Sequence, residues 1–240
     1  MMKLVKLSLS RLAPALCVCL SSMGGAAAFT PTSGAIVLTP PPPSLLRNAF
    51  ESDTRIALIE ERTNFVLPSV VSLDSDGTPG LYEAIGDLTG GVLPAGERVG
   101  IHILHFDAVG TVFTPVRVTG SVTFERPIIG LALRRPTLDA SDLYGAPGTT
   151  YPTLANPSFR EFEFGRGAFG VSDTAQISPD RLTLSLNWGG TEYFDQLRVF
   201  TGVPEPSAIV MLSSLAWGGA LLGARRGQPS RAKQDDGLAL

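Results

Sequence analysis

Two histidines stand in one β-rich run of the chain, and their spacing limits the chemistry they can share. His102 and His105 form a His-x-x-His pair, with Asp107 two residues further on. Residues three apart in an ideal strand point to opposite faces, so the pair binds one metal ion only across a bulge. His105 and Asp107 share a face. The pattern fits a metal or hydrogen-bonded site at His105 and Asp107, or a histidine satisfied by a sheet edge or a nearby carboxylate.

A second candidate site consists of alternating carboxylates before a glycine, Asp74 and Asp76. This arrangement resembles the start of a calcium loop, since Ca²⁺ prefers oxygen ligands. Glu83 does not fall where an EF-hand places its bidentate ligand, and Asp139 or Asp142 would have to supply oxygens from another loop. Asp and Gly also build plain β-turns. Ca²⁺ is therefore the one cofactor for which the sequence offers candidate ligands.

Paired carboxylates for glycoside hydrolysis would have to come from Glu60 or Glu61 together with Glu161 or Glu163. The sequence fixes no distance between them, and alternating Glu and Arg residues usually form the solvated face of a sheet. The body contains no Gly-x-Ser-x-Gly elbow, no P-loop and no dinucleotide fingerprint. We therefore expect no enzymatic activity, with a glycan hydrolase as the lesser alternative.

Aromatic side chains near predicted loops are candidates for stacking on sugars. Loop aromatics at the rim of a β-sandwich are a common means of carbohydrate binding, although core packing explains each of them equally well. The candidates are Trp188, Tyr144, Tyr151 and Tyr193.

The elements that position these residues are predicted to be strands, because the apolar period is two. Apolar and polar residues alternate in 182–187 and in 161–164. Turn-forming Gly, Pro and Asp residues separate the runs, no ten-residue stretch of the body has helical periodicity, and no repeat has a fixed period. The prediction is an all-β fold, a single β-sandwich of jelly-roll type over residues 45–202. Further strands are expected at 34–38, 55–60, 69–73, 98–107, 116–125, 128–133 and 193–200.

The start of the chain has the order of a secretory signal peptide. Basic residues precede an apolar stretch over 12–23, and small residues at Ala26 and Ala28 follow. We expect Sec-type export and cleavage after Ala28. Cys17 and Cys19, the two cysteines, lie inside this segment, so a mature protein has no disulfide, zinc–thiolate site or cysteine nucleophile. The proline-rich residues 29–44 are expected to form a stiff leader outside the folded domain.

The body is acidic, which excludes some partners. Residues 29–203 contain twelve arginines, no lysine and nineteen acidic residues, a net charge of −7. Such a body gains little from a nucleic acid or an anionic lipid surface, so we expect no nucleic-acid partner.

An uncharged apolar run over 207–223 ends at two arginines. As a helix, residues 207–224 would nearly span a membrane, with a buried core helix as the alternative. A Val-Pro-Glu-Pro motif, a short transmembrane helix and an arginine cluster, in this order, resemble the PEP-CTERM sorting signal of exported bacterial proteins. The residues that match the signal are Val203, Pro204, Glu205, Pro206, Arg225 and Arg226.

This resemblance implies recognition by an exosortase and delivery to the cell surface or the extracellular polysaccharide. In this family the tail usually ends soon after the arginines, whereas here residues 227–240 follow, and we expect them to be disordered in the cytoplasm. The body also resembles an uncharacterised group of PEP-CTERM proteins, in phrases such as His105-Phe106-Asp107, which implies an exported β-rich domain and no particular activity.

Together these features predict an exported structural or adhesive protein of the cell surface or extracellular matrix. The C-terminal helix would anchor it in the cytoplasmic membrane with the body outside, until the tail is processed. The alternative is a carbohydrate-binding module that acts on exopolysaccharide.

Overall fold

The computed structural model describes residues 29–110, 116–153, 160–165, 172–190 and 194–203. Within them β-strands dominate and the single α-helix is short, which confirms the all-β class. No helix in these ranges is long and apolar enough to cross a membrane. The predicted signal peptide, the predicted helix over 207–224, the tail and the sorting motif from Pro204 onward all lie outside the described residues.

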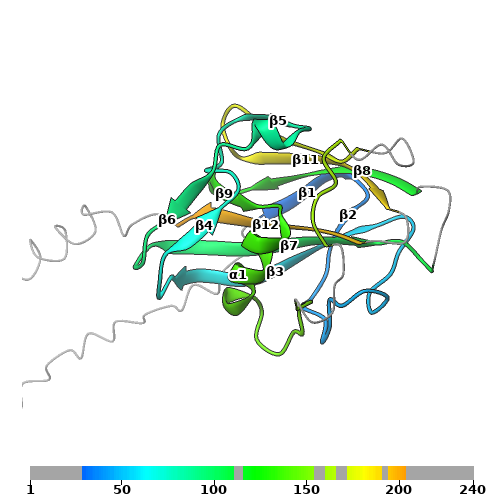
Figure 1. Cartoon of the computed structure of the whole chain (residues 1–240), viewed down its shortest axis with the longest axis horizontal. Helices are drawn as coiled ribbons and strands as arrows, with labels where there is room; N and C mark the ends of the chain where they lie inside the picture. The colour runs from blue at the N-terminus through cyan, green and yellow to red at the C-terminus, as the bar shows by residue number, and fades with distance from the viewer. Residues whose placement is uncertain (1–28, 111–115, 154–159, 166–171, 191–193, 204–240) are drawn as a thin grey trace, which may run out of the picture.

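Ten of the strands form two five-stranded sheets (Figure 1). Sheet A has the order β1 (Phe29–Gly34), β8 (Val116–Phe124), β11 (Thr183–Gly190), β10 (Thr174–Ile177) and β5 (Gly80–Tyr82). Sheet B has the order β2 (Ile36–Leu38), β3 (Ile56–Val66), β7 (Arg98–Asp107), β12 (Phe194–Gly202) and β9 (Ile128–Ala132).

Neighbouring strands within the two sheets are antiparallel except for β2 and β3. A third, two-stranded antiparallel sheet pairs β4 (Val71–Leu73) with β6 (Gly91–Leu93). The helical elements are short and are formed by η1 (Ile85–Asp87), α1 (Arg135–Ser141) and η2 (Asp142–Tyr144). The sequence predicted none of these three elements and none of β1, β5, β6 and β10.

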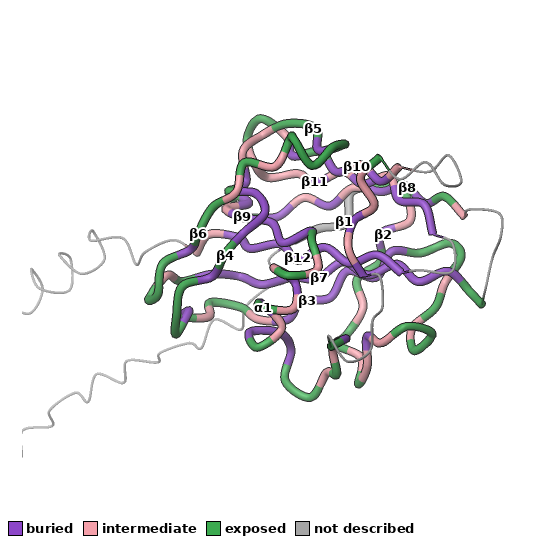
Figure 2. Tube along the Cα trace, viewed as in Figure 1, coloured by how far each residue is buried: buried purple, intermediate pink, exposed green. Residues whose placement is uncertain are grey.

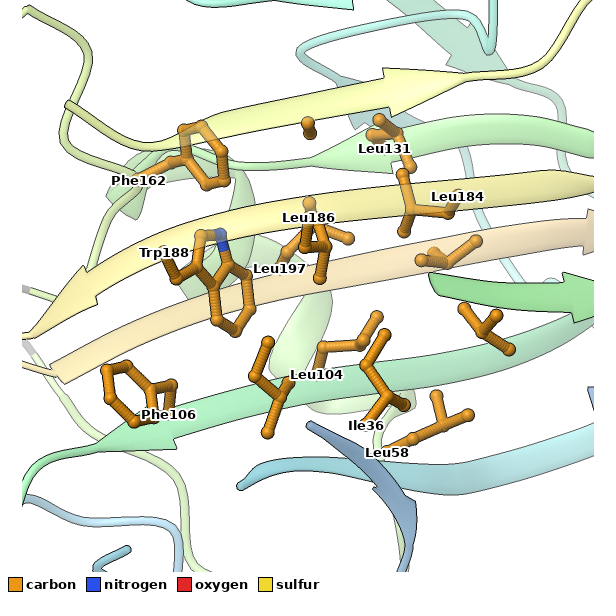
Figure 3. Close-up of a cluster of buried hydrophobic side chains, with 14 of the residues drawn as sticks. Ile36, Leu58, Leu104, Phe106, Leu131, Phe162, Leu184, Leu186, Trp188 and Leu197 are labelled. Carbon is orange, nitrogen blue, oxygen red and sulfur yellow. The ribbon is translucent and has the colours of Figure 1, made fainter. Parts of the chain in front are cut away.

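The main core consists of buried side chains from both sheets. Leu104 and Phe106 of β7 and Leu186 and Trp188 of β11 belong to one cluster, in which every second residue of each strand takes part (Figure 3). This is the period of two on which the strand prediction rests. Burial of these side chains is the principal stabilising contribution to the fold.

The second face of sheet B is also covered, which the alternating pattern does not predict. Val99, Ile101 and Ile103 of β7 pack against side chains from 45–50 and 138–151. As a result β7 and β12 are buried at almost every position (Figure 2). Polar residues on this outer face of sheet B are therefore inside the protein.

Two predictions about local structure are wrong. Residues 29–44 are not a leader outside the fold, because β1 pairs with β8 and β2 pairs with β3. Residues 161–164 are not a strand: Phe162 donates its N–H to the carbonyl of Leu133 at 3.0 Å, and its ring packs on Trp188. The alternation there reflects phenylalanines that enter the core from an irregular segment.

Candidate functional site

A buried ionic network occupies the outer face of sheet B, and it brings together four of the predicted site residues, Glu61, Asp139, Asp142 and Tyr151. Arg198 of β12 donates to both carboxylate oxygens of Glu61 of β3, at 2.7 Å from Nε and 3.0 Å from Nη2. Its Nη1 donates to Ser141 Oγ at 2.6 Å. The hydroxyl of Tyr151 donates to Glu61, and the ring of Tyr151 lies 5.2 Å from the guanidinium carbon.

Asp142 joins this network to a second arginine. Its carboxylate lies 3.0 Å from Nη2 of Arg198 and accepts hydrogen bonds from Arg160 at 2.6 and 3.0 Å. Asp139 also binds Arg160, at 3.1 Å. The predicted oxygen ligands Asp139 and Asp142 thus bind guanidinium groups.

The electrostatics of the network favour one charge state. Burial acts to lower the pKa of Arg198, but the carboxylates of Glu61 and Asp142 outweigh it and raise that pKa. Burial and the charge of Glu61 raise the pKa of the Tyr151 hydroxyl. Both carboxylate oxygens of Glu61 are therefore engaged by a fixed cation, which suits this residue to a structural ion pair.

The two histidines point to opposite faces of sheet B, as predicted. The His102 ring lies 5.2 Å from the Phe29 ring and 5.0 Å from the Phe124 ring, between the sheets. The His105 ring lies on the outer face, 5.5 Å from the Phe194 ring. Burial lowers the pKa of each histidine to about 3, so both are neutral at physiological pH.

Hydrogen bonds fix the tautomer of His105. The amide nitrogen of Gln196 donates to the carbonyl of Leu45 at 3.2 Å and lies 3.0 Å from Nδ1 of His105, so Nδ1 is the acceptor. The ring proton of the neutral imidazole is then on Nε2. That atom is buried and has no partner of good hydrogen-bonding geometry, although a backbone hydrogen bond with Phe50 acts to raise the pKa of the ring against the effect of burial.

His105 lines a pocket of about 160 Å³, room for about five water molecules. Its Nε2 atom is buried in the wall of this pocket, beside the backbone of Phe50. Glu51 and Arg55 add charges of both signs, and Phe50 adds an aromatic face. The remaining lining residues are Val37, Thr39, Ser52 and Ala57.

Asp107 shares the outer face with His105 but has its own partners. Its Oδ2 accepts the backbone N–H of Asn48 at 2.6 Å, and its carbonyl accepts that of Ser52 at 2.7 Å. Burial raises the pKa of the Asp107 carboxyl to about 6. Asp107 therefore holds the segment that forms one wall of the pocket.

The carboxylates of Asp74 and Asp76 bind different parts of the chain. Asp74 Oδ2 accepts the backbone N–H groups of Leu133 at 2.7 Å and Arg134 at 2.8 Å, and the hydroxyl of Thr137. Asp76 Oδ1 accepts from Thr78 and Thr89. Across the described ranges no group of three or more His, Cys, Asp or Glu side chains is arranged to bind a metal ion. The calcium site stays a prediction.

The structure contradicts the sugar-stacking prediction for two of the four aromatic residues. Trp188 is completely buried in the core and Tyr144 is nearly so, with its hydroxyl 2.6 Å from Ser69 Oγ. Tyr151 is half-buried in the Arg198 network, and Tyr193 lies outside the described residues. The opposite sheet encloses Trp188, and segments over the outer face of sheet B enclose Tyr144. A single sequence does not show which segments will cover a sheet in this way.

Acidic side chains gather where β10, β11 and β12 meet at one end of the fold. Asp173 accepts the backbone N–H groups of Glu163 and Gly189, each at 2.9 Å. Burial raises the pKa of Asp173 to about 7, and burial with the nearby charges of Asp173 and Glu163 raises that of Asp195. Glu163 is thus found beside two aspartates, and not opposite Glu60 or Glu61 as a hydrolase pair.

No protein-family model, curated protein or solved structure matches this chain. The arguments about function therefore come from its own residues. Sequence reasoning had singled out His105 but missed the residues around it, Phe50, Glu51 and Arg55. These lie in a segment without apolar periodicity, so no sequence signal connects them to His105.

Proposed function

We propose that this chain is an exported protein with a structural or adhesive role at the cell surface or in the extracellular matrix. Its body would be a β-sandwich of jelly-roll type, held in the cytoplasmic membrane by the C-terminal helix until an exosortase acts on the tail. The observation that carries the proposal is the order of the Pro204-Glu205-Pro206 motif, the uncharged run and the arginines Arg225 and Arg226.

The end of the fold supports this division of the chain. β12, a central strand of sheet B, ends at Gly202, immediately before Val203. The last residues of the body are therefore tied into a sheet, and a tail cut after them would leave that sheet intact. The prolines of the motif fix an extended backbone, the form in which proteases usually bind their substrates.

The sorting proposal can be tested in a bacterium that has an exosortase. Pro204, Glu205 and Pro206 are replaced together by alanine, and the mass of the exported chain and its cell fraction are measured. A matched control replaces Gln228, Pro229 and Ser230 in the tail. We expect processing to stop in the first variant alone. An unchanged processed fraction in the first variant contradicts the proposal.

A second candidate function, binding of carbohydrate, is supported by the pocket at His105. A sugar hydroxyl can accept from the guanidinium of Arg55 and donate to a carboxylate such as that of Glu51, and Phe50 offers an apolar ring for a sugar face. A glycan hydrolase is the lesser alternative. Because Arg198 engages Glu61 and Glu163 lies beside Asp173, the acid and base of such a hydrolase would have to be Glu60 and Glu161.

A glycan array that includes matrix polysaccharides tests this second candidate. The exported chain is compared with Arg55→Ala and Glu51→Gln variants, and with Glu83→Gln as a control at an exposed carboxylate away from the pocket. We expect both pocket variants to lose binding and the control to retain it. Binding to no glycan, or equal binding by all variants, contradicts it.

A further inference from the structure

Glu60 has a buried carboxylate oxygen without a hydrogen-bonding partner. It belongs to β3, where Ile56 and Leu58 face the space between the sheets, and by the same period of two Glu60 faces the same space. Its Oε2 atom is buried and makes no hydrogen bond. The residue as a whole is only half-buried, and removing one of its oxygens from water without a donor carries a cost. A positive partner at this place would offset that cost.

The first described residue of the chain lies at the same place. Glu60 is opposite His102 in the pairing of β3 with β7, and the His102 ring lies 5.2 Å from the ring of Phe29. Phe29 and Glu60 line one open cavity of about 460 Å³. Leu38, Thr39, Pro40 and Pro41 complete its lining.

Phe29 is firmly held by the fold. Its side chain is 4% exposed, its ring packs on Phe124 at 6.1 Å, and its backbone is paired with Phe124 in sheet A. His102 does not supply the missing charge, because burial keeps it neutral and its Nδ1 also lacks a partner. Phe29 is thus fixed in the lining of a cavity that Glu60 also lines, and one carboxylate oxygen of Glu60 has no partner.

We propose that removal of the signal peptide creates the missing partner, the α-ammonium of Phe29, which pairs with the carboxylate of Glu60. This inference rests on the proposed cleavage after Ala28. Water adds across the bond between Ala28 and Phe29, so that Ala28 leaves with a carboxylate and Phe29 gains an amine. That amine has an ordinary pKa near 8 and is protonated at neutral pH.

The pairing would make the mature chain differ from its precursor in stability as well as in length. In the precursor the Phe29 nitrogen is a neutral amide with one donor, whereas the ammonium has three donors and a charge. β1 is an edge strand of sheet A, and Glu60 belongs to β3 of sheet B. The new ion pair would therefore attach this edge strand to the other sheet. Export and maturation would then complete the fold.

The experiment compares two forms of the chain in detergent. One comprises residues 29–240 with Phe29 as its first residue, and the other has Gly-Ser added before Phe29. Each form is made with Glu60, with Glu60→Gln, and with Glu83→Gln as the control at an exposed carboxylate. Thermal unfolding and the rate at which the α-amine is acylated at pH 7 are measured. N-terminal sequencing of the naturally exported protein tests the cleavage separately.

We expect the form that begins at Phe29 to melt roughly 2–4 °C above the extended form, and this difference to vanish with Glu60→Gln only. Pairing with Glu60 raises the pKa of the α-amine, and one unit leaves about tenfold less free amine at neutral pH. Acylation should therefore be about tenfold slower in the chain with Glu60 than in the Glu60→Gln variant. The Glu83→Gln control should be acylated as slowly as the unaltered chain.

Two results overturn the inference, and they are distinguishable. A natural N-terminus at any residue other than Phe29 contradicts the proposed cleavage. Equal melting temperatures and equal acylation rates, whether or not Glu60 is present, contradict the pairing itself. The extended form keeps Glu60 in place, so the comparison holds even where the Glu60→Gln chain fails to fold.

Discussion

Arg198 and Glu61 form a two-point ion pair between β12 and β3, with both side chains excluded from solvent. The strand β7 lies between these two strands in sheet B, so the pair spans its outer face. All the donors of the guanidinium are directed to Glu61, Asp142, Ser141 or the Leu138 carbonyl. The pair therefore fastens the α1 and η2 region to the sheet.

Replacing Arg198 by methionine should strongly destabilise the protein. The substitution leaves Glu61 buried without its cation, and breaking a buried pair in this way costs about 3–5 kcal/mol. Denaturant unfolding followed by circular dichroism measures the loss. Arg126→Met is the matched control, since Arg126 is exposed, and it should change the free energy of unfolding by less than about 0.5 kcal/mol.

A double variant separates the charge from the packing. Arg198→Met combined with Glu61→Leu removes both charges, and apolar replacements of a buried pair are often close to neutral. The double variant should therefore be more stable than Arg198→Met alone. If it is less stable, the unpaired charge of Glu61 is not the cause of the destabilisation.

Three buried carboxyl groups should lower the free energy of unfolding as pH rises from about 4 to about 7, and the buried histidines His102 and His105, whose pKa values are about 3, offset part of this fall below about pH 6.5. Burial raises the pKa of Asp107 to about 6 and that of Asp173 to about 7, and raises that of Asp195 as well. In this window the unfolded chain has released protons that the folded protein still holds, so raising the pH favours unfolding. Asp173 alone contributes a slope of about −1.4 kcal/mol per pH unit.

Urea unfolding at several pH values measures this dependence, with Asp195→Asn as the informative variant. Removing the ionisable group at position 195 should flatten the fall in stability. Asp76 and Asp180 have pKa values lowered by hydrogen bonds, so they act in the opposite direction, and only below about pH 4. His102 and His105 act in the opposite direction up to about pH 6.5. A wild-type protein whose stability rises between about pH 6.5 and 7 would contradict the assignment.

The sequence predicted the positions of the strands better than the segments that pack on the outer face of sheet B. β7 has the predicted bounds 98–107, because a long run of apolar residues in a β-rich context leaves few alternatives. The outer cover of sheet B was not predictable, since it depends on contacts such as that of Arg198 with Glu61, 137 residues apart. Trp188 was misassigned for the same reason: a glycine-rich context suggested a loop, whereas it lies in β11.

The candidate site was predicted only in part. The period of two placed His102 and His105 on opposite faces, and His105 together with Asp107 on one face, which the structure confirms. The pocket wall at Phe50 and Arg55 comes from an irregular segment, where no periodicity relates a residue to a face. Backbone hydrogen bonds to Asp107 fix that segment, and these depend on tertiary structure.

Asp74 should matter for stability much more than its neighbour Asp76. Replacing Asp74 by alanine removes an acceptor from two backbone N–H groups and a hydroxyl at the start of α1, and leaving a buried donor without its acceptor costs about 1–3 kcal/mol. We expect Asp74→Ala to lower the free energy of unfolding by about 2–3 kcal/mol. Asp76→Ala, at an exposed carboxylate, should cost about 1 kcal/mol or less. Equal losses in denaturant unfolding would contradict the assignment.

Gly34 should tolerate no side chain, because the chain passes from sheet A to sheet B at this point. Its φ of +72° favours glycine, and a Cβ atom would lie 2.2 Å from the carbonyl oxygen of Thr119. That carbonyl also accepts the N–H of Ala35 at 2.8 Å, so it cannot move without losing the hydrogen bond.

Gly96 provides the matched comparison, since its φ is +87° but a Cβ atom there would meet nothing within 4 Å. Gly96→Ala should therefore show the backbone cost alone, about 1–2 kcal/mol. Gly34→Ala adds the steric clash and should cost about 1–3 kcal/mol more. Thermal unfolding of the two variants measures the difference. Because the backbone cost is common to both, equal melting temperatures would mean that β1 and β2 do not meet Thr119 as closely as the structure shows.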